Sequence, residues 1–174
     1  LADPSYLHSF PTRRSSDLNS FTYKNWDLSI FLQWSLGNDI LNANRMVFEN
    51  PAKKKNTNMF ASYAGRWTPE NSGSDMPRAN ALGSNEYSSL YVEDGSFLKL
   101  KTISLGYNFS AAMLKKAHIS SARVFVSAEN IATITGYSGS DPEVSTRNSV
   151  LTPGFDWSAY PRSFNASIGV NLTF

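Results

Sequence analysis

Apolar and polar residues alternate strictly along the last part of the chain, residues 162–174. The apolar set is made up of Phe164, Ala166, Ile168, Val170, Leu172 and Phe174. Because successive side chains of a β-strand point to opposite faces, this alternation predicts a strand with one apolar face. The stretch is longer than the usual strand of about 5–6 residues and suits the ~9–11 residues that cross a bilayer at a tilt. A long edge strand of a soluble β-sandwich would show the same alternation.

The same pattern predicts three further strands, over residues 21–35, 97–109 and 122–134. In the first, Trp26 and Trp34 lie at the two ends of the apolar face, as in the aromatic girdles of a barrel wall or among the core residues of a sandwich. In the second, we expect Lys99 and Lys101 to continue the apolar face to a rim where lysines reach lipid phosphates. In the third, the alternation loosens after Asn130.

The connections between these strands run long, short and long, over residues 37–95, 110–121 and 136–161. Long loops are uncommon in compact soluble domains but are typical of the outer side of membrane barrels. In the first loop, residues 39–48 fit either a continued strand or a short helix, and the short link fits a loose helical turn. The predicted fold class is therefore all-β, with about four long antiparallel strands of an incomplete transmembrane β-barrel.

Composition narrows the function without identifying it. The net charge of +2 over 174 residues gives no reason to expect a nucleic-acid partner. The absence of cysteine excludes disulfides and thiolate chemistry. Because His8 and His118 are the only histidines and neither belongs to a credible catalytic set, we expect no enzyme activity, catalytic residue or cofactor.

Three loop carboxylates, Asp141, Glu143 and Asp156, are weak candidates for calcium ligands. They do not follow any recognised metal-binding spacing. Solvated loop carboxylates are the favoured interpretation, so no metal site is predicted.

The run from His8 to Leu18 resembles the conceptual translation of a common short-read sequencing adapter. The segment also lacks a sustained period, and Pro11, Arg13 and Arg14 interrupt it. We therefore interpret residues 1–18 as a non-native segment and expect them to be unpaired or only loosely placed. Residues 19–174 are then the C-terminal part of the barrel.

Several longer stretches resemble the SusC/RagA family of TonB-dependent outer-membrane transporters. They are residues 92–107 (VEDGSFLKLKTISLGY), 124–131 (VFVSAENI), 135–143 (TGYSGSDPE) and 155–162 (FDWSAYPR), with the terminal phenylalanine. Residues 23–33 and 37–39 fit the same family, so the resemblance covers nearly everything after Asn19, in order.

The resemblance implies a Gram-negative outer-membrane barrel of about 22 strands with an N-terminal plug. It implies import of glycans or peptides with a SusD-like surface lipoprotein, driven by the TonB complex through a part that these residues do not contain. It also implies contact with outer-membrane lipid, and recognition by the barrel-assembly machinery, for which Phe174 is the candidate signal. Alternatively, Phe174 only fills the inner aromatic girdle. A structural or adhesive outer-membrane barrel is the alternative function.

Four aromatic residues of the predicted loops could stack on a substrate or a partner: Trp67, Tyr137, Trp157 and Tyr160. Flat aromatic faces suit sugar rings and peptide side chains. Packing between loops, or anchoring in a girdle, is the alternative for all four.

Overall fold

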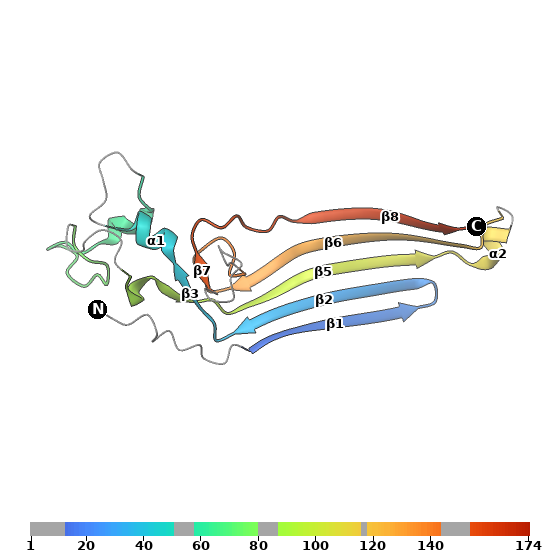
Figure 1. Ribbon diagram of the computed structural model, residues 1–174, viewed down its shortest axis with the longest axis horizontal. Helices are drawn as coiled ribbons and strands as arrows, with labels where there is room; N and C mark the ends of the chain where they lie inside the picture. The colour runs from blue at the N-terminus through green and yellow to red at the C-terminus, as the bar shows by residue number, and fades with distance from the viewer. Residues whose placement is uncertain (1–12, 51–57, 80–86, 116–117, 144–153) are drawn as a thin grey trace. The chain divides into compact units, whose positions relative to one another are not determined.

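The computed structural model describes residues 13–50, 58–79, 87–115, 118–143 and 154–174 (Figure 1). The chain divides into two compact units. The sheet unit comprises Leu1–Asn38, Ser96–Gly136 and Arg162–Phe174, and the loop unit comprises Asp39–Gly95 and Tyr137–Pro161. Each unit is built from segments that are distant in the sequence.

The sheet unit is a five-stranded sheet in the order β1-β2-β5-β6-β8, in which every neighbouring pair is antiparallel (Figure 1). The strands are β1 (Arg13–Tyr23), β2 (Trp26–Leu36), β5 (Phe97–Asn108), β6 (Ser121–Thr135) and β8 (Asn165–Thr173). A short helix, α2 (Ala111–Leu114), lies in the link between β5 and β6. The predicted antiparallel fold and the helical turn in the short link are confirmed. Both long connections leave the same end of the sheet, where Phe97 pairs with Ser35 and Thr135.

The prediction of one strand over residues 21–35 is wrong, because a hairpin interrupts it. Tyr23 pairs with Trp26, so Lys24 and Asn25 form the turn between β1 and β2. Lys24 adopts the left-handed conformation, with φ 54°. Lysine is not a characteristic residue for that conformation, and no Asn-Gly or Asp-Gly pair marks the turn.

The expectation that residues 1–18 are unpaired is also wrong where the structure describes them. Arg13 to Leu18 pair with Leu36 to Phe31 of β2 and extend β1 to the length of its neighbour. Backbone hydrogen bonds do not depend on side-chain identity, so a stretch with an unsuitable pattern can still pair with a long exposed strand. Residues 1–12 lie outside the described residues.

Side chains from all five strands form rows across the sheet, because residues opposite each other in register share a face. An apolar row contains Phe21, Leu28, Leu105, Val126 and Ile168. A serine row on the other face contains Ser20, Ser29, Ser104, Ser127 and Ser167. The Ser127 and Ser167 hydroxyls are hydrogen-bonded at 2.7 Å. We call these surfaces the apolar face and the polar face.

Aromatic rings gather on the apolar face near the hairpin turn. The rings of Trp26 and Tyr107 meet edge to face with centroids 4.9 Å apart, and those of Tyr107 and Phe109 do so at 5.1 Å. Trp34 lies on the same face near the other end of β2, opposite Leu98. The predicted placement of tryptophans at both ends of the apolar face is therefore confirmed.

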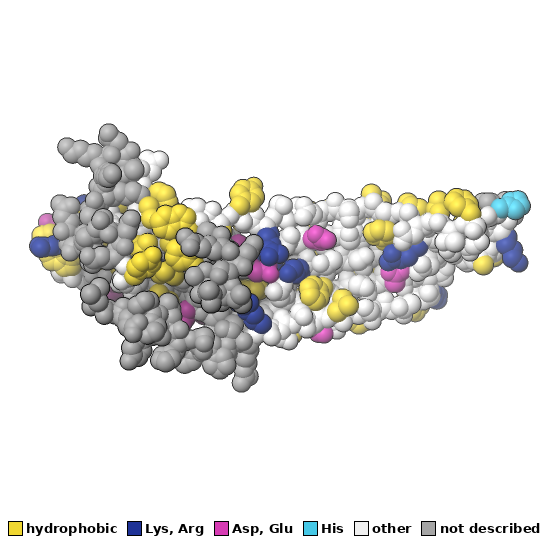
Figure 2. Space-filling model, in the orientation of Figure 1, with side chains coloured by type: hydrophobic (Ala, Val, Ile, Leu, Met, Phe, Trp, Pro, Cys, Tyr) yellow, Lys and Arg dark blue, Asp and Glu magenta, His cyan; other side chains and the backbone are white. Residues whose placement is uncertain are grey.

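An ion pair crosses a whole strand on the polar face. Arg123 of β6 donates from Nε to Asp27 Oδ1 of β2 at 3.2 Å, although β5 lies between these strands. A Cβ at Gly106 of β5 would lie 2.5 Å from Arg123 Nη2 and 2.6 Å from Asp27 Oδ2, so only glycine leaves room for the bridge. Figure 2 shows a sheet surface that is mostly neutral, with scattered charges of both signs.

A β-bulge at Lys101 overturns the expectation that Lys99 and Lys101 continue the apolar face. Lys101 is the extra residue between Leu100 and Thr102, which pair with adjacent residues of β2. An inserted residue reverses the facing of everything beyond it, so Lys99 stands opposite Gln33 on the polar face. Lys101 donates to Gln33 Oε1 at 2.6 Å.

The loop unit contains a small sheet in the order β4-β3-β7. Its elements are β3 (Asp39–Asn42), α1 (Ala43–Phe48), η2 (Ala61–Gly65), η3 (Ser89–Tyr91), β4 (Val92–Asp94) and β7 (Phe155–Asp156). Residues 39–48 therefore form a strand followed by a helix. The core is small and packs Ala43, Met46 and Tyr91 against partly buried apolar neighbours. No helix in the described parts is long and apolar enough to cross a membrane.

The apolar pattern of β1 begins only at Phe21, shortly after the adapter-like segment ends at Leu18. Phe21 and Tyr23 continue the apolar face, but Asn19 stands on that face opposite Ile30, and Asp17 opposite Leu32. Ser15 likewise stands opposite Trp34. The native residues at positions 15 and 17 are expected to be apolar, since the neighbouring strand is apolar in both rows.

We propose that residues 1–18 replace native sequence, and resequencing the locus from an adapter-free library tests this. The native codons are expected to place apolar residues at positions 15 and 17 and to retain Phe21 and Tyr23. Recovery of the same codons for residues 8–18 would contradict the proposal.

Candidate functional site

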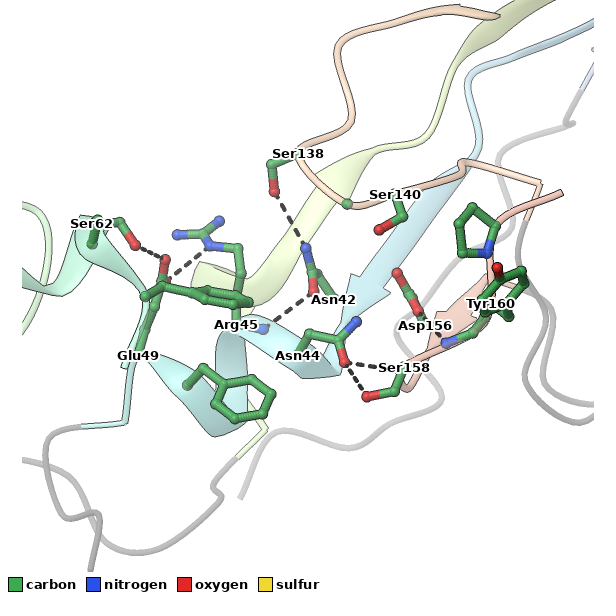
Figure 3. Close-up of a pocket in the computed structure, with 16 residues that line it drawn as sticks. Asn42, Asn44, Arg45, Glu49, Ser62, Ser138, Ser140, Asp156, Ser158 and Tyr160 are labelled. Carbon is green, nitrogen blue, oxygen red and sulfur yellow. Dashed lines mark hydrogen bonds and ion pairs between the residues drawn. The ribbon is translucent and has the colours of Figure 1, made fainter. Parts of the chain in front are cut away.

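A pocket of about 870 Å³ lies within the loop unit (Figure 3). Helix α1 contributes Asn44 and Arg45, and the segment before and within η2 contributes Phe60 and Ser62. The remaining wall comes from residues 138–140, after β6, and residues 158–161, after β7. Its size is within the range of about 300–1,000 Å³ that small-molecule sites occupy.

Glu93 of β4 does not line the pocket itself, but it is hydrogen-bonded to three residues that do. Its Oε1 accepts hydrogen bonds from Asn42 Nδ2 at 3.1 Å, Arg45 Nη1 at 3.0 Å and Ser138 Oγ at 2.8 Å. Its Oε2 accepts from the Ser138 backbone N–H at 2.9 Å. Burial opposes ionisation of Glu93, but the hydrogen bonds from Ser138, Arg45 and Asn42 outweigh it and lower the pKa of the carboxyl.

Arg45 lies between two carboxylates. Its Nε donates to Glu49 Oε2 at 2.9 Å, one helical turn away, while its Nη1 donates to Glu93. Ser62 donates its hydroxyl to the other oxygen of Glu49 at 2.5 Å. Burial favours the neutral guanidine, but the two carboxylates prevail and raise the pKa of Arg45. The cation is therefore fixed in place and faces two negative charges.

A buried hydrogen bond joins Tyr137 and Asp156, which lie on either side of residues 144–153 in the sequence. The Tyr137 hydroxyl donates to Asp156 Oδ2 at 2.6 Å, and the Ala159 N–H donates to Asp156 Oδ1 at 3.3 Å. Burial, and then the bond to Asp156, raise the pKa of Tyr137 well above its usual range. Ser158 donates both its N–H and its hydroxyl to Asn44 Oδ1, which fixes the amide of Asn44 at the pocket.

The four predicted aromatic residues have different surroundings. Tyr160 lines the pocket and is 90% exposed. Tyr137 is buried, whereas Trp157 is partly exposed and stacks on Phe155 of its own segment with ring centroids 6.3 Å apart. Trp67 lies outside the pocket lining, and its backbone N–H donates to the Met76 carbonyl.

The weak metal candidates serve local hydrogen bonds. Asp141 Oδ1 accepts from the Glu143 N–H at 2.9 Å, which forms a turn, and Asp156 accepts from Tyr137 and Ala159. Over the described parts of the chain, no three acidic or histidine side chains come together as a metal site would require.

Sequence reasoning missed the polar residues that shape the pocket: Asn42, Arg45, Glu49, Glu93 and Ser138. Only the i, i+4 spacing of Arg45 and Glu49 was a usable signal, and it depended on recognising α1. The other contacts join residues from distant parts of the chain, such as Glu93 and Ser138, which are 45 residues apart.

Comparison with known proteins finds relatives over almost the whole chain. TonB-dependent receptor P3 of Formosa agariphila is 35% identical over 161 residues, and TonB-dependent receptor SusC of Bacteroides thetaiotaomicron is 29% identical over 154 residues. These alignments cover 90% and 87% of this chain but only 16% and 14% of those proteins. No family model matches the chain.

Solved structures show the same relationship. The RagAB peptide importer in its open-open state matches with a TM-score of 0.77 and 26% identity, over 94% of this chain and 17% of that one. The RagAB peptide transporter matches with a TM-score of 0.73 and 27% identity. The antiparallel sheet thus matches part of the barrel fold of the RagAB transporter, which confirms the predicted fold class. The predicted resemblance to the SusC/RagA family of TonB-dependent transporters is confirmed, since the relatives include SusC and the solved structures are those of RagAB.

Replacing Glu93 with glutamine should loosen the loop unit. A depressed folded-state pKa contributes stability above the unfolded-state pKa, and this contribution is lost as the pH falls through the folded-state value. At neutral pH, Glu93→Gln should therefore speed hydrogen exchange in residues 137–143 of the full-length protein, and acid should do the same to the unmodified protein. Glu70→Gln, which changes an exposed carboxylate of the same unit, is the control. Equal exchange in both variants would contradict the role of Glu93.

Proposed function

We propose that this chain forms wall and outer loops of an outer-membrane importer of glycans or peptides. In this proposal the importer is driven by TonB and works with a SusD-like surface lipoprotein. The names of its relatives support the TonB dependence, and the RagAB structures support import, since they are described as a peptide transporter and importer. The chain spans about a sixth of these relatives, so it supplies part of the machinery.

The single observation that carries the proposal is the two-faced sheet. On β8 the apolar side chains are exposed, at 75% for Ile168, 58% for Val170 and 48% for Leu172. A soluble sandwich would bury such a face against a second sheet. A membrane wall instead turns its apolar face to lipid and its polar face to a wet lumen.

The loops supply the contact with ligand in this proposal. Both long connections leave the same end of the sheet, and the pocket is built from both of them. The strands hold the pore and carry no chemistry. We assign the wider partners, namely outer-membrane lipid, the TonB complex and the barrel-assembly machinery, on the same family relationship.

We also propose that Phe174 belongs to the assembly signal of the barrel. It follows the last alternating strand and is 83% exposed, so it is accessible to a receptor. An aromatic residue that only fills the inner girdle would have the same exposure.

Deleting Phe174 from the full-length protein separates the two roles. If Phe174 belongs to the assembly signal, the yield of folded barrel in the outer membrane should fall, whereas a normal yield would leave only the girdle role.

Growth tests the import proposal. A strain lacking the intact gene should grow poorly on the glycans or peptides that the importer takes, and loss of TonB function should cause the same defect. Restoring the complete gene should rescue growth only when TonB is functional. If the strain lacking the gene takes up every tested glycan and peptide normally but no longer attaches to surfaces, the import proposal is contradicted and the adhesive function is supported.

A further inference from the structure

We propose that the loop pocket takes an uncharged, hydroxyl-rich ligand, such as part of a neutral oligosaccharide, and rejects anionic ligands. The inference rests on the proposed function in one respect, because it takes the pocket to be a place where imported material meets the outer loops. It goes further by assigning the charge selectivity to named residues: Arg45, Glu49 and Glu93.

The charge around the pocket disfavours anions. Arg45 is the only cationic side chain among the described residues that line it. Two carboxylates, Glu49 and Glu93, already accept hydrogen bonds from this guanidinium at 2.9 and 3.0 Å. Asp156 is a second carboxylate of the lining, together with Glu49, whereas Glu93 lies outside the lining. A sulfate or uronate group would meet one cation that already faces two carboxylates, with Asp156 in the same lining, so the local charge would repel it.

Neutral hydrogen-bonding groups remain available at the pocket. Within the described part of the chain, the Ser140 hydroxyl and the Asn44 amide nitrogen take part in no hydrogen bond, whereas the Asn44 oxygen is occupied by Ser158. The Ser140 hydroxyl can both donate and accept a hydrogen bond, and the Asn44 amide nitrogen can donate. Such groups match sugar hydroxyls without adding charge.

Aromatic rings at the pocket offer apolar surface for a sugar ring. Phe60 is 42% exposed and packs against Phe48 with ring centroids 5.3 Å apart. Tyr160 lines the same pocket from the segment after β7, and most of its side chain is exposed (Figure 3). Rings of this kind cover the C–H faces of a sugar, while the hydroxyls at its edge reach polar groups.

The selectivity depends on Glu49, which therefore provides the sharpest test. Glu49→Gln removes one of the two carboxylates that neutralise Arg45 and leaves a side chain of nearly the same shape. The guanidinium then faces one carboxylate fewer, so an anionic ligand meets less repulsion and a cation that is less neutralised. The variant should gain affinity for acidic glycans relative to neutral ones by about tenfold.

The experiment uses the full-length protein on an array of neutral, uronate-bearing and sulfated oligosaccharides. The unmodified protein should retain neutral ligands. Tyr160→Ala, which alters an exposed side chain outside the loop core, should weaken their binding about fivefold. Glu49→Gln should shift the preference towards acidic ligands, and the control Glu70→Gln should change nothing.

Three results would overturn the proposal: preference of the unmodified protein for acidic glycans, binding of no neutral glycan, or equal behaviour of Glu49→Gln and Glu70→Gln. If Glu49→Gln fails to fold, unchanged neutral-ligand binding by Tyr160→Ala overturns it. These outcomes are separate from failure of the import proposal. If uptake depends on TonB but the pocket variants keep the ligand preference of the unmodified protein, only the pocket proposal is contradicted. If the pocket binds ligands selectively but uptake does not depend on TonB, only the import proposal is contradicted.

Discussion

Strand register is the constraint on which the rest of the structure depends. Because side chains alternate with a period of two, a slip of one residue in any strand would move its apolar side chains to the polar face. Antiparallel pairing aligns Leu28, Leu105 and Ile168 in one apolar row and the serines in a row on the other face. Backbone groups in hydrocarbon must be satisfied by neighbouring strands, so the hydrogen bonds that set the register also make a membrane wall possible.

The loop unit is stabilised mainly by polar side-chain contacts rather than by strand register. It has little apolar core, and its segments are joined by polar contacts centred on the partly buried Glu93 and by the buried Tyr137–Asp156 hydrogen bond. A partly buried carboxylate is stable when its hydrogen bonds compensate for lost hydration, and Glu93 accepts four. The contacts that hold the loop segments together also pair Arg45 with carboxylates. In our proposal this pairing determines which ligand charges the pocket accepts.

Local alternation predicted the long strands well, because period-two patterning needs no knowledge of partners. It failed at Lys24, where the hairpin has no characteristic turn pair, and at Lys101, where a bulge reverses the faces of the residues beyond it. Arg14 to Leu18 show the opposite case, since an unsuitable pattern still pairs through its backbone. The pocket was largely unpredictable, because the contacts of Glu93 and Asp156 join distant segments. Of the residues proposed from the sequence for ligand contact, Tyr160 lies at the pocket and Tyr137 supports it from within.

The most direct test of a two-faced membrane wall compares arginine on the two faces of β8 in the full-length protein. Ile168 lies in the apolar row, whereas Asn165 lies on the polar face opposite Glu129. Denaturant unfolding in lipid vesicles should show that Ile168→Arg costs about 2–4 kcal/mol if its row lies near the midplane, and that Asn165→Arg costs much less. Equal costs at the two positions, or a greater cost at Asn165, would contradict a lipid-facing apolar surface.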